Sequence, residues 1–175
     1  MRLIHFSDKP VRLGDLIARG QDEHGAMKPK GLWVSDEDDE MGWRQWCIEE
    51  DFRLDLLTHV HEVTLGNDAN VLFLKTADEV RAFGREFTIQ HGPFAGGGFT
   101  GHIRYALDWV RVIQRWHGIV ITPYQWDCRL ENDTFWYYGW DAASGCLWDP
   151  QAIGSIILRE IVEAPQPAYP RDNPD

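Results

Sequence analysis

The chain has 175 residues, of which 43% are hydrophobic and 26% are charged, and its formal net charge is −11. This composition predicts one soluble globular domain, and the absence of a long apolar run predicts no membrane span. Because surfaces that bind nucleic acid are usually basic, the charge argues against general nucleic-acid binding but permits a basic partner.

The cysteines and the N-terminal residues predict a cytoplasmic protein. Cys47, Cys128 and Cys146 have no paired spacing, so we expect reduced thiols and no zinc site. The first ten residues meet a charge and a proline too early for a signal peptide.

Short strands and helices are expected to follow one another without regular alternation. The predicted strands cover residues 2–6, 28–35, 59–65, 70–75, 118–124, 135–150 and 151–164, and the predicted helices cover 41–52, 76–87 and 103–116. Thr76 and Glu79 form a predicted capping box at the start of the second helix. This order favours an α+β domain over residues 1–164, with short, mostly antiparallel strands in a split or sandwich-like sheet flanked by helices. The proline-rich tail, 165–175, is expected to be extended or disordered.

The aromatic content is the feature of the composition that points to function. Nine tryptophans in a chain of this length exceed what a core ordinarily needs. Either they form a tryptophan-rich core, or some of them line a binding surface for a flat ligand.

Three other patterns are interpreted as structural. The glycine-rich residues 92–101 match no phosphate-binding motif and are expected to form a flexible loop or a lid. His59 and His61 share one strand face and are expected to be a satisfied surface pair, since a third metal ligand is lacking. The acidic run 36–40 does not match the spacing of a calcium loop, and we interpret it as a solvated connection.

Three segments carry the strongest functional signal. The first places His5 and Ser7 on one face of the N-terminal strand, with Phe6 between them. The second is the strand "GLWVS", followed by a helix that bears two tryptophans. The third begins at "HGIVITPY", continues through a polar loop and ends in "WDAASGCLWDPQAIGSI".

In this order the three segments resemble the ADP-ribosyltransferases related to diphtheria toxin and the poly(ADP-ribose) polymerases. In that family the first strand carries a histidine two residues before a serine or threonine. The second strand carries an aromatic residue, and the helix after it brings another. "RWHGIVI" and "CLWDPQAIGSI" are similar to two late strands of the family, of which the second begins after "FDP". The resemblance spans most of the chain and implies NAD as substrate, without a metal.

The chemistry of NAD explains why such residues are needed. Its nicotinamide ring is flat, and its ribose becomes oxocarbenium-like as the glycosidic bond breaks, so a pocket needs an aromatic face, polar groups and a carboxylate. By resemblance, His5 holds a ribose hydroxyl and Trp33 replaces the first tyrosine of the family. Lys28 and Lys30 would lie near the pyrophosphate. The implied NAD-binding residues are His5, Phe6, Ser7, Lys30, Gly31, Trp33, Trp43 and Trp46.

The chain departs from the family at the usual catalytic glutamate. That residue would lie four positions before the aromatic residue of "FDP", which is Trp148 here, and its counterpart is Ser144. The nearest upstream carboxylate is Asp141, which is either catalytic or a turn residue, and Glu131 and Asp133 lie in the loop before it. The implied catalytic residues are His5, Ser35, Asp141 and Ser144.

Three functions therefore remain open at the level of the sequence. The first is NAD-dependent transfer of ADP-ribose to a protein or nucleic acid, as in toxins, effectors or phage proteins. The second is a non-catalytic module of the same fold that binds a nucleotide or a protein. The third is an acidic interaction protein or inhibitor, which the net charge favours.

Overall fold

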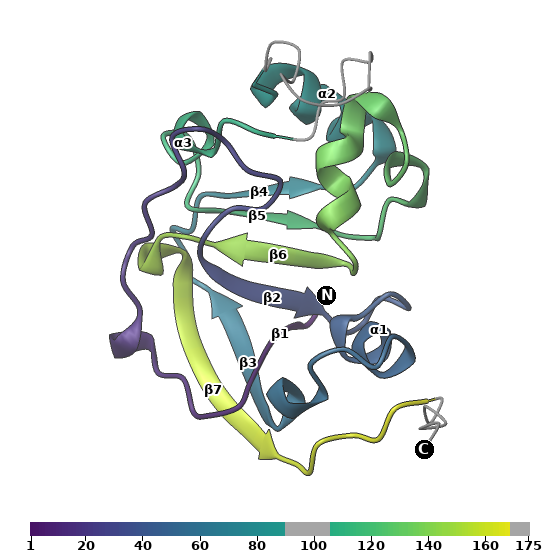
Figure 1. Cartoon of the computed structure of the whole chain (residues 1–175). Coiled ribbons are helices and arrows are strands. Elements are labelled where there is room, and N and C mark those ends of the chain that lie inside the picture. The colour runs from purple at the N-terminus through teal and green to yellow at the C-terminus, as the bar shows by residue number, and fades with distance from the viewer. Residues whose placement is uncertain (90–105, 169–175) are drawn as a thin grey trace.

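The computed structural model describes residues 1–89 and 106–168, and these build one seven-stranded sheet in the order β4-β5-β6-β2-β1-β3-β7 (Figure 1). The strands are β1 (Leu3–Ser7), β2 (Leu32–Asp36), β3 (His59–Leu65), β4 (Val71–Leu74), β5 (Gly118–Ile121), β6 (Ser144–Leu147) and β7 (Ile153–Ile161). Strands β4 and β5 pair in parallel, and the other five pairings are antiparallel. The predicted α+β class with mostly antiparallel strands is thus confirmed.

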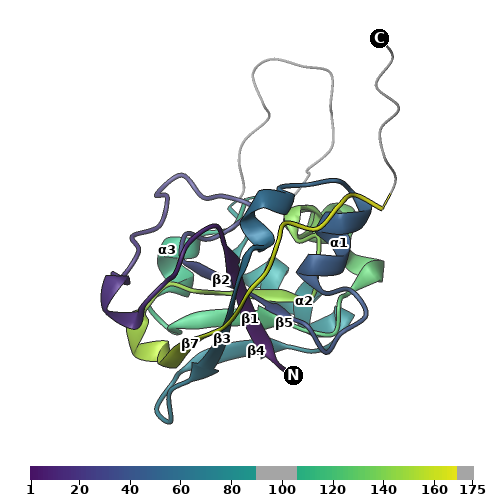
Figure 2. The same ribbon diagram turned by 90° about the horizontal axis from the view of Figure 1, so that it is seen from below.

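Three helices and five short 3₁₀ turns accompany the sheet among the described residues. They are α1 (Trp43–Glu49), α2 (Ala77–Phe87) and α3 (Trp109–Val112), with the short 3₁₀ turns η1 (Leu13–Asp15), η2 (Leu54–Leu57), η3 (Trp126–Cys128), η4 (Asn132–Gly139) and η5 (Pro150–Ala152). Figure 1 shows α2 beyond the β4 edge and α1 beside the ends of β1 and β2, and Figure 2 shows the same elements from below. The capping box of Thr76 and Glu79 is present as predicted.

The sheet opens between β1 and β2. These strands are in register at two positions, Leu3 with Asp36 and Ile4 with Ser35, whereas β1 pairs with β3 at four positions. Beyond Ile4, strand β1 therefore follows β3 and leaves β2. Figure 1 shows the outcome: β1, β3 and β7 run at a steep angle to β2, β6, β5 and β4.

Two predicted elements differ in the structure. The helix expected over 103–116 is limited to α3 among the described residues, because it begins only at Asp108, whose side chain accepts the backbone N–H of Arg111. The aromatic run after residue 134, expected as a strand, belongs to η4. Trp136 and Tyr137 in η4 and Trp140 directly after it are all buried, and this spacing fits a helical turn better than the alternating faces of a strand.

Two hydrophobic cores hold the sheet. The larger one packs α2, α3 and η4 against β5 and β6, and it contains four buried tryptophans, Trp109, Trp136, Trp140 and Trp148. The smaller one joins β1, β2, β3, β5 and β6 on the opposite face. Tryptophan thus builds much of the core, while Trp33 is only half-buried against it. No helix of the described chain is long and apolar enough to cross a membrane.

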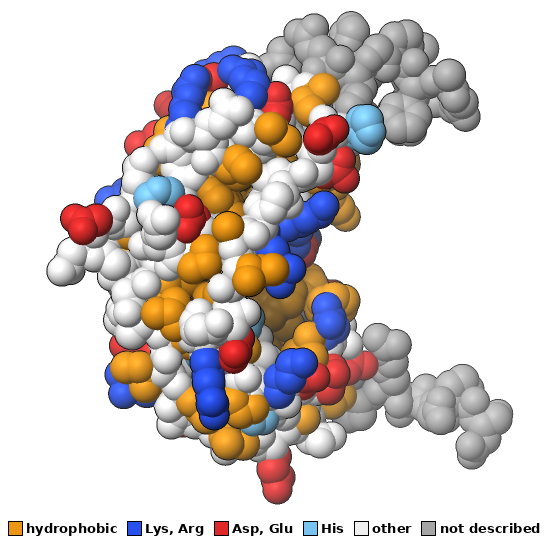
Figure 3. Space-filling model, turned by 90° about the vertical axis from the view of Figure 1, so that its left-hand side faces the viewer, with side chains coloured by type: hydrophobic (Ala, Val, Ile, Leu, Met, Phe, Trp, Pro, Cys, Tyr) orange, Lys and Arg blue, Asp and Glu red, His pale blue; other side chains and the backbone are white. Residues whose placement is uncertain are grey.

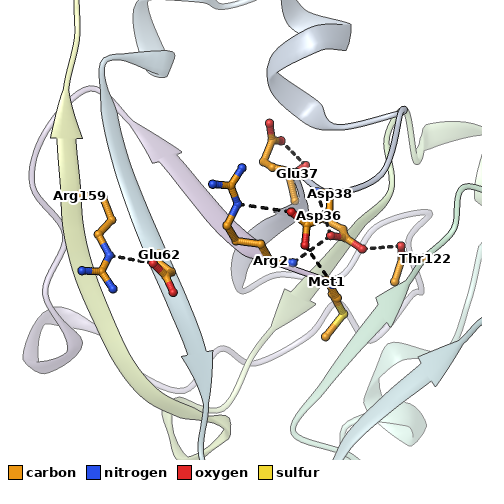
Figure 4. Close-up of polar contacts among 9 residues, drawn as sticks. Met1, Arg2, Asp36, Glu37, Asp38, Glu62, Thr122 and Arg159 are labelled. Atoms are coloured by element: carbon orange, nitrogen blue, oxygen red, sulfur yellow. Dashed lines mark hydrogen bonds and ion pairs between the residues drawn. The ribbon is translucent and has the colours of Figure 1, made fainter.

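The acidic run 36–40 is not a solvated connection at its first residue, which corrects that expectation. Asp36 is 5% exposed, and its carboxylate accepts hydrogen bonds from the backbone N–H of Arg2 and from the hydroxyl of Thr122. Asp38 forms ion pairs with the N-terminal amine and with Arg2. Figure 4 shows this network, which ties the N-terminus to β2 and β5. Asp36 and Asp38 therefore stabilise the sheet through hydrogen bonds and ion pairs.

Candidate functional site

In Figure 3 the surface is hollowed near the middle of the molecule, at the height that β2 occupies in Figure 1. This hollow is called the recess. Figure 3 shows hydrophobic side chains at the floor of this recess and Lys and Arg side chains beside it. Strands β6, β2 and β1, which are consecutive in the sheet, carry the three segments singled out in the sequence. The candidate site is therefore built from these strands and from the segments that follow or precede them.

His5 joins the two halves of the sheet where the ladder has ended. Its Nδ1 lies 2.8 Å from the backbone oxygen of Trp33, and this atom carries the proton because a carbonyl can only accept. Burial lowers the pKa of His5, although the bond to Trp33 opposes the shift. Ser7, two residues on, is less engaged, since its hydroxyl donates to the nearby backbone oxygen of Lys9. Phe6 between them is half-buried.

His61 is the partner of His5 that the sequence did not reveal. The two residues are opposite each other in the β1–β3 ladder, with ring centroids 5.9 Å apart. His61 is fully buried, and its Nε2 accepts the backbone N–H of Val11 at 3.0 Å, while its Nδ1 has no partner. The expected surface pair of His59 and His61 is therefore wrong for His61, because the chain after β1 folds back and covers it.

Trp33 forms an aromatic floor that rests on the fully buried Trp140. Their ring centroids are 4.8 Å apart in an edge-to-face arrangement, and Lys28 Nζ lies 5.2 Å from the centre of the Trp33 ring. Lys28 thus lies over the only partly exposed Trp33 ring. Lys30 is exposed, and its backbone is fixed by two hydrogen bonds to the side chain of Gln21.

Gly31 is explained by packing against β6. A Cβ atom at this position would lie 2.6 Å from the backbone oxygen of Leu147 and 2.7 Å from the sulfur of Cys146. The residue therefore has no side chain because β6 approaches its backbone closely. This role is structural, and a contact with a ligand is not needed to account for the glycine.

Trp43 and Trp46 stack on each other, with ring centroids 5.0 Å apart and an interplanar angle of 18°. Phe52 packs edge-on against both rings. Among the described residues the aromatic ring that contacts Trp33 is Trp140, so the α1 tryptophans form an aromatic group separate from Trp33. Both are half-buried, which leaves part of each ring accessible.

Asp141 lies between two cations. Its carboxylate is 3.5 Å from Lys28 Nζ and 3.9 Å from the guanidinium of Arg129. Arg129, which the sequence did not single out, also lies over the rings of Trp126 and Tyr138, at 5.9 and 5.6 Å. The charge of Asp141 is therefore compensated by neighbours on both sides.

Ser35 and Ser144 are opposite each other in the β2–β6 ladder and share one face of the sheet. The hydroxyl of Ser144 donates to the backbone oxygen of Ala142 at 2.8 Å. The hydroxyl of Ser35 donates to the Glu37 carboxylate at 2.6 Å and accepts the backbone N–H of Trp43 at 2.8 Å. Both hydroxyls are thus occupied in the protein itself, and Ser35 fixes the start of α1.

Glu37 is the acidic residue of this site that sequence reasoning missed. It lies two residues after Ser35 but one residue beyond β2, where the chain turns, so no strand pattern in the sequence could have placed it beside Ser35. Burial, followed by the charges of Glu37 and Asp141, raises the pKa of the Cys47 thiol to about 12. The charges of Glu37 and Asp141 thus both act on a buried thiol of α1.

The sequence-predicted residues are only partly brought together. Trp33, Lys28 and Asp141 form a continuous contact, and Ser35 faces Ser144. The imidazole of His5 reaches the backbone of Trp33, but it points to the His61 side of the sheet, since Ile4 and not His5 shares a face with Ser35. Within the described ranges, no group of three or more His, Cys, Asp or Glu side chains is arranged to hold a metal ion.

Comparison of the chain with models of protein families, with curated proteins and with solved structures gave no match. The function must therefore be inferred from the residues and the geometry.

Proposed function

We propose that this protein binds NAD in the recess beside β2 and transfers its ADP-ribose to a macromolecular target. The observation that carries the proposal is the adjacency of β6, β2 and β1. These strands come from distant parts of the chain, and they carry the three segments on which the resemblance to ADP-ribosyltransferases rests. The sheet opens between β1 and β2, where His5 holds the backbone of Trp33.

The residues present are compatible with a dinucleotide. Trp33 and the stacked pair Trp43 and Trp46 supply half-exposed aromatic faces, on which a flat ring can stack. Lys28 and Arg129 share a single carboxylate, Asp141, so the three groups carry a net positive charge in an acidic protein. That charge favours a phosphate group beside the aromatic floor.

A target could be contacted by the segment between β5 and β6. Three large apolar side chains of this segment are exposed: Trp126 at 53%, Leu130 at 73% and Tyr138 at 44%. Exposed aromatic and aliphatic groups next to an arginine, here Arg129, are typical of protein-binding surfaces. This composition favours a protein target over a nucleic acid, in agreement with the negative charge of the chain.

One observation favours a second function, namely binding without chemistry. Ser144 lies where the resemblance would have the catalytic glutamate, and its hydroxyl is bound to Ala142. Asp141, the nearest upstream carboxylate, is compensated by two cations. A protein that holds NAD or another nucleotide in the same recess without cleaving it would show this arrangement.

The test measures binding and cleavage separately. The protein is titrated with NAD by calorimetry, and it is incubated with adenylate-labelled NAD and a cell lysate while released nicotinamide and transferred label are measured. Transfer and release support the proposal, and binding without release selects the binding module. Lys28→Ala should weaken NAD binding, whereas Lys75→Ala, an exposed lysine outside the recess, should not. The proposal fails if the wild-type protein neither binds NAD nor releases nicotinamide.

A further inference from the structure

We infer that Glu37, and not Asp141 or a residue of β6, supplies the carboxylate that stabilises the developing charge when NAD is cleaved. This inference rests on the proposed function and names a residue to which the resemblance gives no role. It starts from the position of Glu37 beside Ser35, which is the cross-strand neighbour of Ser144. The carboxylate missing from Ser144 on β6 is thus replaced by one at the end of β2.

The surroundings of Glu37 fix its carboxylate. The Ser35 hydroxyl donates to its Oε1 at 2.6 Å, and the backbone N–H of Arg44 approaches the same atom at 3.4 Å. Gly42 leaves the space that the carboxylate needs, since a Cβ atom there would lie 3.0 to 3.2 Å from the Glu37 carboxyl atoms. A carboxylate whose Oε1 accepts two hydrogen bonds loses little further freedom when a substrate binds, which favours catalysis.

Glu37 and Asp141 differ in whether a cation compensates the negative charge of the carboxylate. Asp141 lies within 4 Å of both Lys28 and Arg129, so its negative charge is already compensated. Glu37 forms no ion pair with any residue among 1–89 and 106–168, and the donors recorded for it are neutral. An uncompensated carboxylate stabilises a developing cation more strongly than one that is already paired.

The direction of the side chain is consistent with this role. Trp33 and Ser35 alternate with the residues of β2 that face the opposite core, so both lie on the Trp140 side of the sheet. Glu37 follows β2 in a turn, and the hydrogen bond from the Ser35 hydroxyl places its carboxylate on the same side. Asp36 and Asp38, the neighbours of Glu37, are instead occupied by the N-terminus, Arg2 and Thr122 (Figure 4). Of these three acids, only Glu37 has its carboxylate bound to Ser35, the cross-strand neighbour of Ser144.

Glu37 acts in two steps of this reaction, the cleavage of NAD and the attack of the target on the ribose. The bond between the nicotinamide nitrogen and C1′ of the ribose breaks, and nicotinamide leaves with the electron pair. A hydroxyl or amine of the target, or water, forms the new bond to C1′ and loses one proton, which the Glu37 carboxylate accepts and passes to solvent. Glu37 faces the positive charge that develops on the ribose between these two events.

The test compares four variants, Glu37→Gln, Glu37→Asp, Asp141→Asn and Glu40→Gln, with the wild-type protein. Glu37→Gln retains an oxygen that can accept from Ser35 and Arg44, so it is expected to fold and to bind NAD with unchanged affinity. Its kcat for nicotinamide release should fall about 100-fold or more, with little change in KM. Glu37→Asp, which keeps the negative charge on a shorter side chain, should lose less of its kcat than Glu37→Gln. Glu40→Gln, an exposed acid of the same run, is the matched control and should retain full kcat.

The outcomes separate this inference from the proposed function. If the wild-type protein releases nicotinamide and Glu37→Gln does so within about threefold, the inference is overturned while the proposed function stands. A larger loss in Asp141→Asn than in Glu37→Gln also overturns it, because the role then belongs to Asp141. If the wild-type protein releases no nicotinamide, both the transfer reaction and the role of Glu37 are rejected. Should Glu37→Gln fail to fold, the kcat of Glu37→Asp decides, and full activity there overturns the inference.

Discussion

The Nδ1 atom of His5 donates to the backbone oxygen of Trp33 across 2.8 Å, just where the ladder between β1 and β2 has ended. A side chain thus takes over from the backbone hydrogen bonds that would otherwise join these strands. The Trp33 carbonyl would have no partner in the opening if the imidazole were absent. This contact therefore links β1 to β2 beyond the end of their ladder.

Replacement of His5 by alanine should destabilise the protein by about 1 kcal/mol, since it removes one partly buried hydrogen bond and leaves the Trp33 carbonyl unsatisfied. Urea unfolding at pH 8 measures this change in the free energy of unfolding. Ser7→Ala is the control, because the Ser7 hydroxyl bonds only to the neighbouring Lys9 backbone among the described residues. Equal losses in both variants would contradict a bridging role for His5.

The stability of the protein should fall as the pH decreases from about 7 to 5.5. Burial lowers the pKa of both His5 and His61 below the ordinary value of about 6.5. As the pH falls through about 6.5, the unfolded chain therefore binds more protons at these two histidines than the native state does. Above about pH 7 both histidines are neutral in the native and in the unfolded state, so they do not make the free energy of unfolding depend on pH. The free energy of unfolding, measured by urea titration at several pH values, should therefore decrease over this range.

His61→Gln isolates the contribution of the buried residue to that pH dependence. The glutamine amide can accept the backbone N–H of Val11 in place of Nε2, but it does not titrate. The dependence on pH should be shallower in this variant, by up to about 1.4 kcal/mol per pH unit for a full proton. An unchanged dependence would show that His61 does not cause it.

The fold was largely readable from the sequence because it depends on local patterns. The alternation in "HVHEVTL" predicts β3, and the spacing of Thr76 and Glu79 predicts the start of α2. The 3₁₀ segment η4 was missed because its aromatic residues also favour strands, and only tertiary packing of Trp136 and Trp140 against the core decides between the two.

The candidate site was readable only in part because its contacts are long-range. The strand positions of Trp33 and Ser35 follow from alternation, but the pairing of Ser35 with Ser144 joins segments that are 109 positions apart. Burial of His61 and Asp36 depends equally on what folds over them, namely the chain near Val11 and the N-terminus. A pattern within one segment carries no information about such neighbours.

Substitution of Gly31 by alanine should destabilise the protein by about 1 to 3 kcal/mol, because the new methyl group would overlap the backbone of Leu147 and force β2 away from β6. Thermal unfolding measures the effect. Gly14→Ala and Gly20→Ala are matched controls, since a Cβ atom at either position meets nothing within 4 Å. Both should be neutral or slightly stabilising. If Gly31→Ala melts at the same temperature as these controls, the close approach of β6 is wrong.

All three cysteines should resist alkylation in the native protein. Cys47, Cys128 and Cys146 are free and fully buried, and burial is the largest cause that raises the pKa of each thiol. Because the thiolate is the nucleophile, both access and ionisation oppose the reaction with iodoacetamide at pH 8. Mass spectrometry should find no label without denaturant and three labels in concentrated urea.

In intermediate urea, the three sites should be labelled together at the rate of global unfolding. Faster labelling of Cys47 alone would contradict this expectation, and it would show that α1 detaches from the sheet and from Glu37 while the rest of the core stays folded.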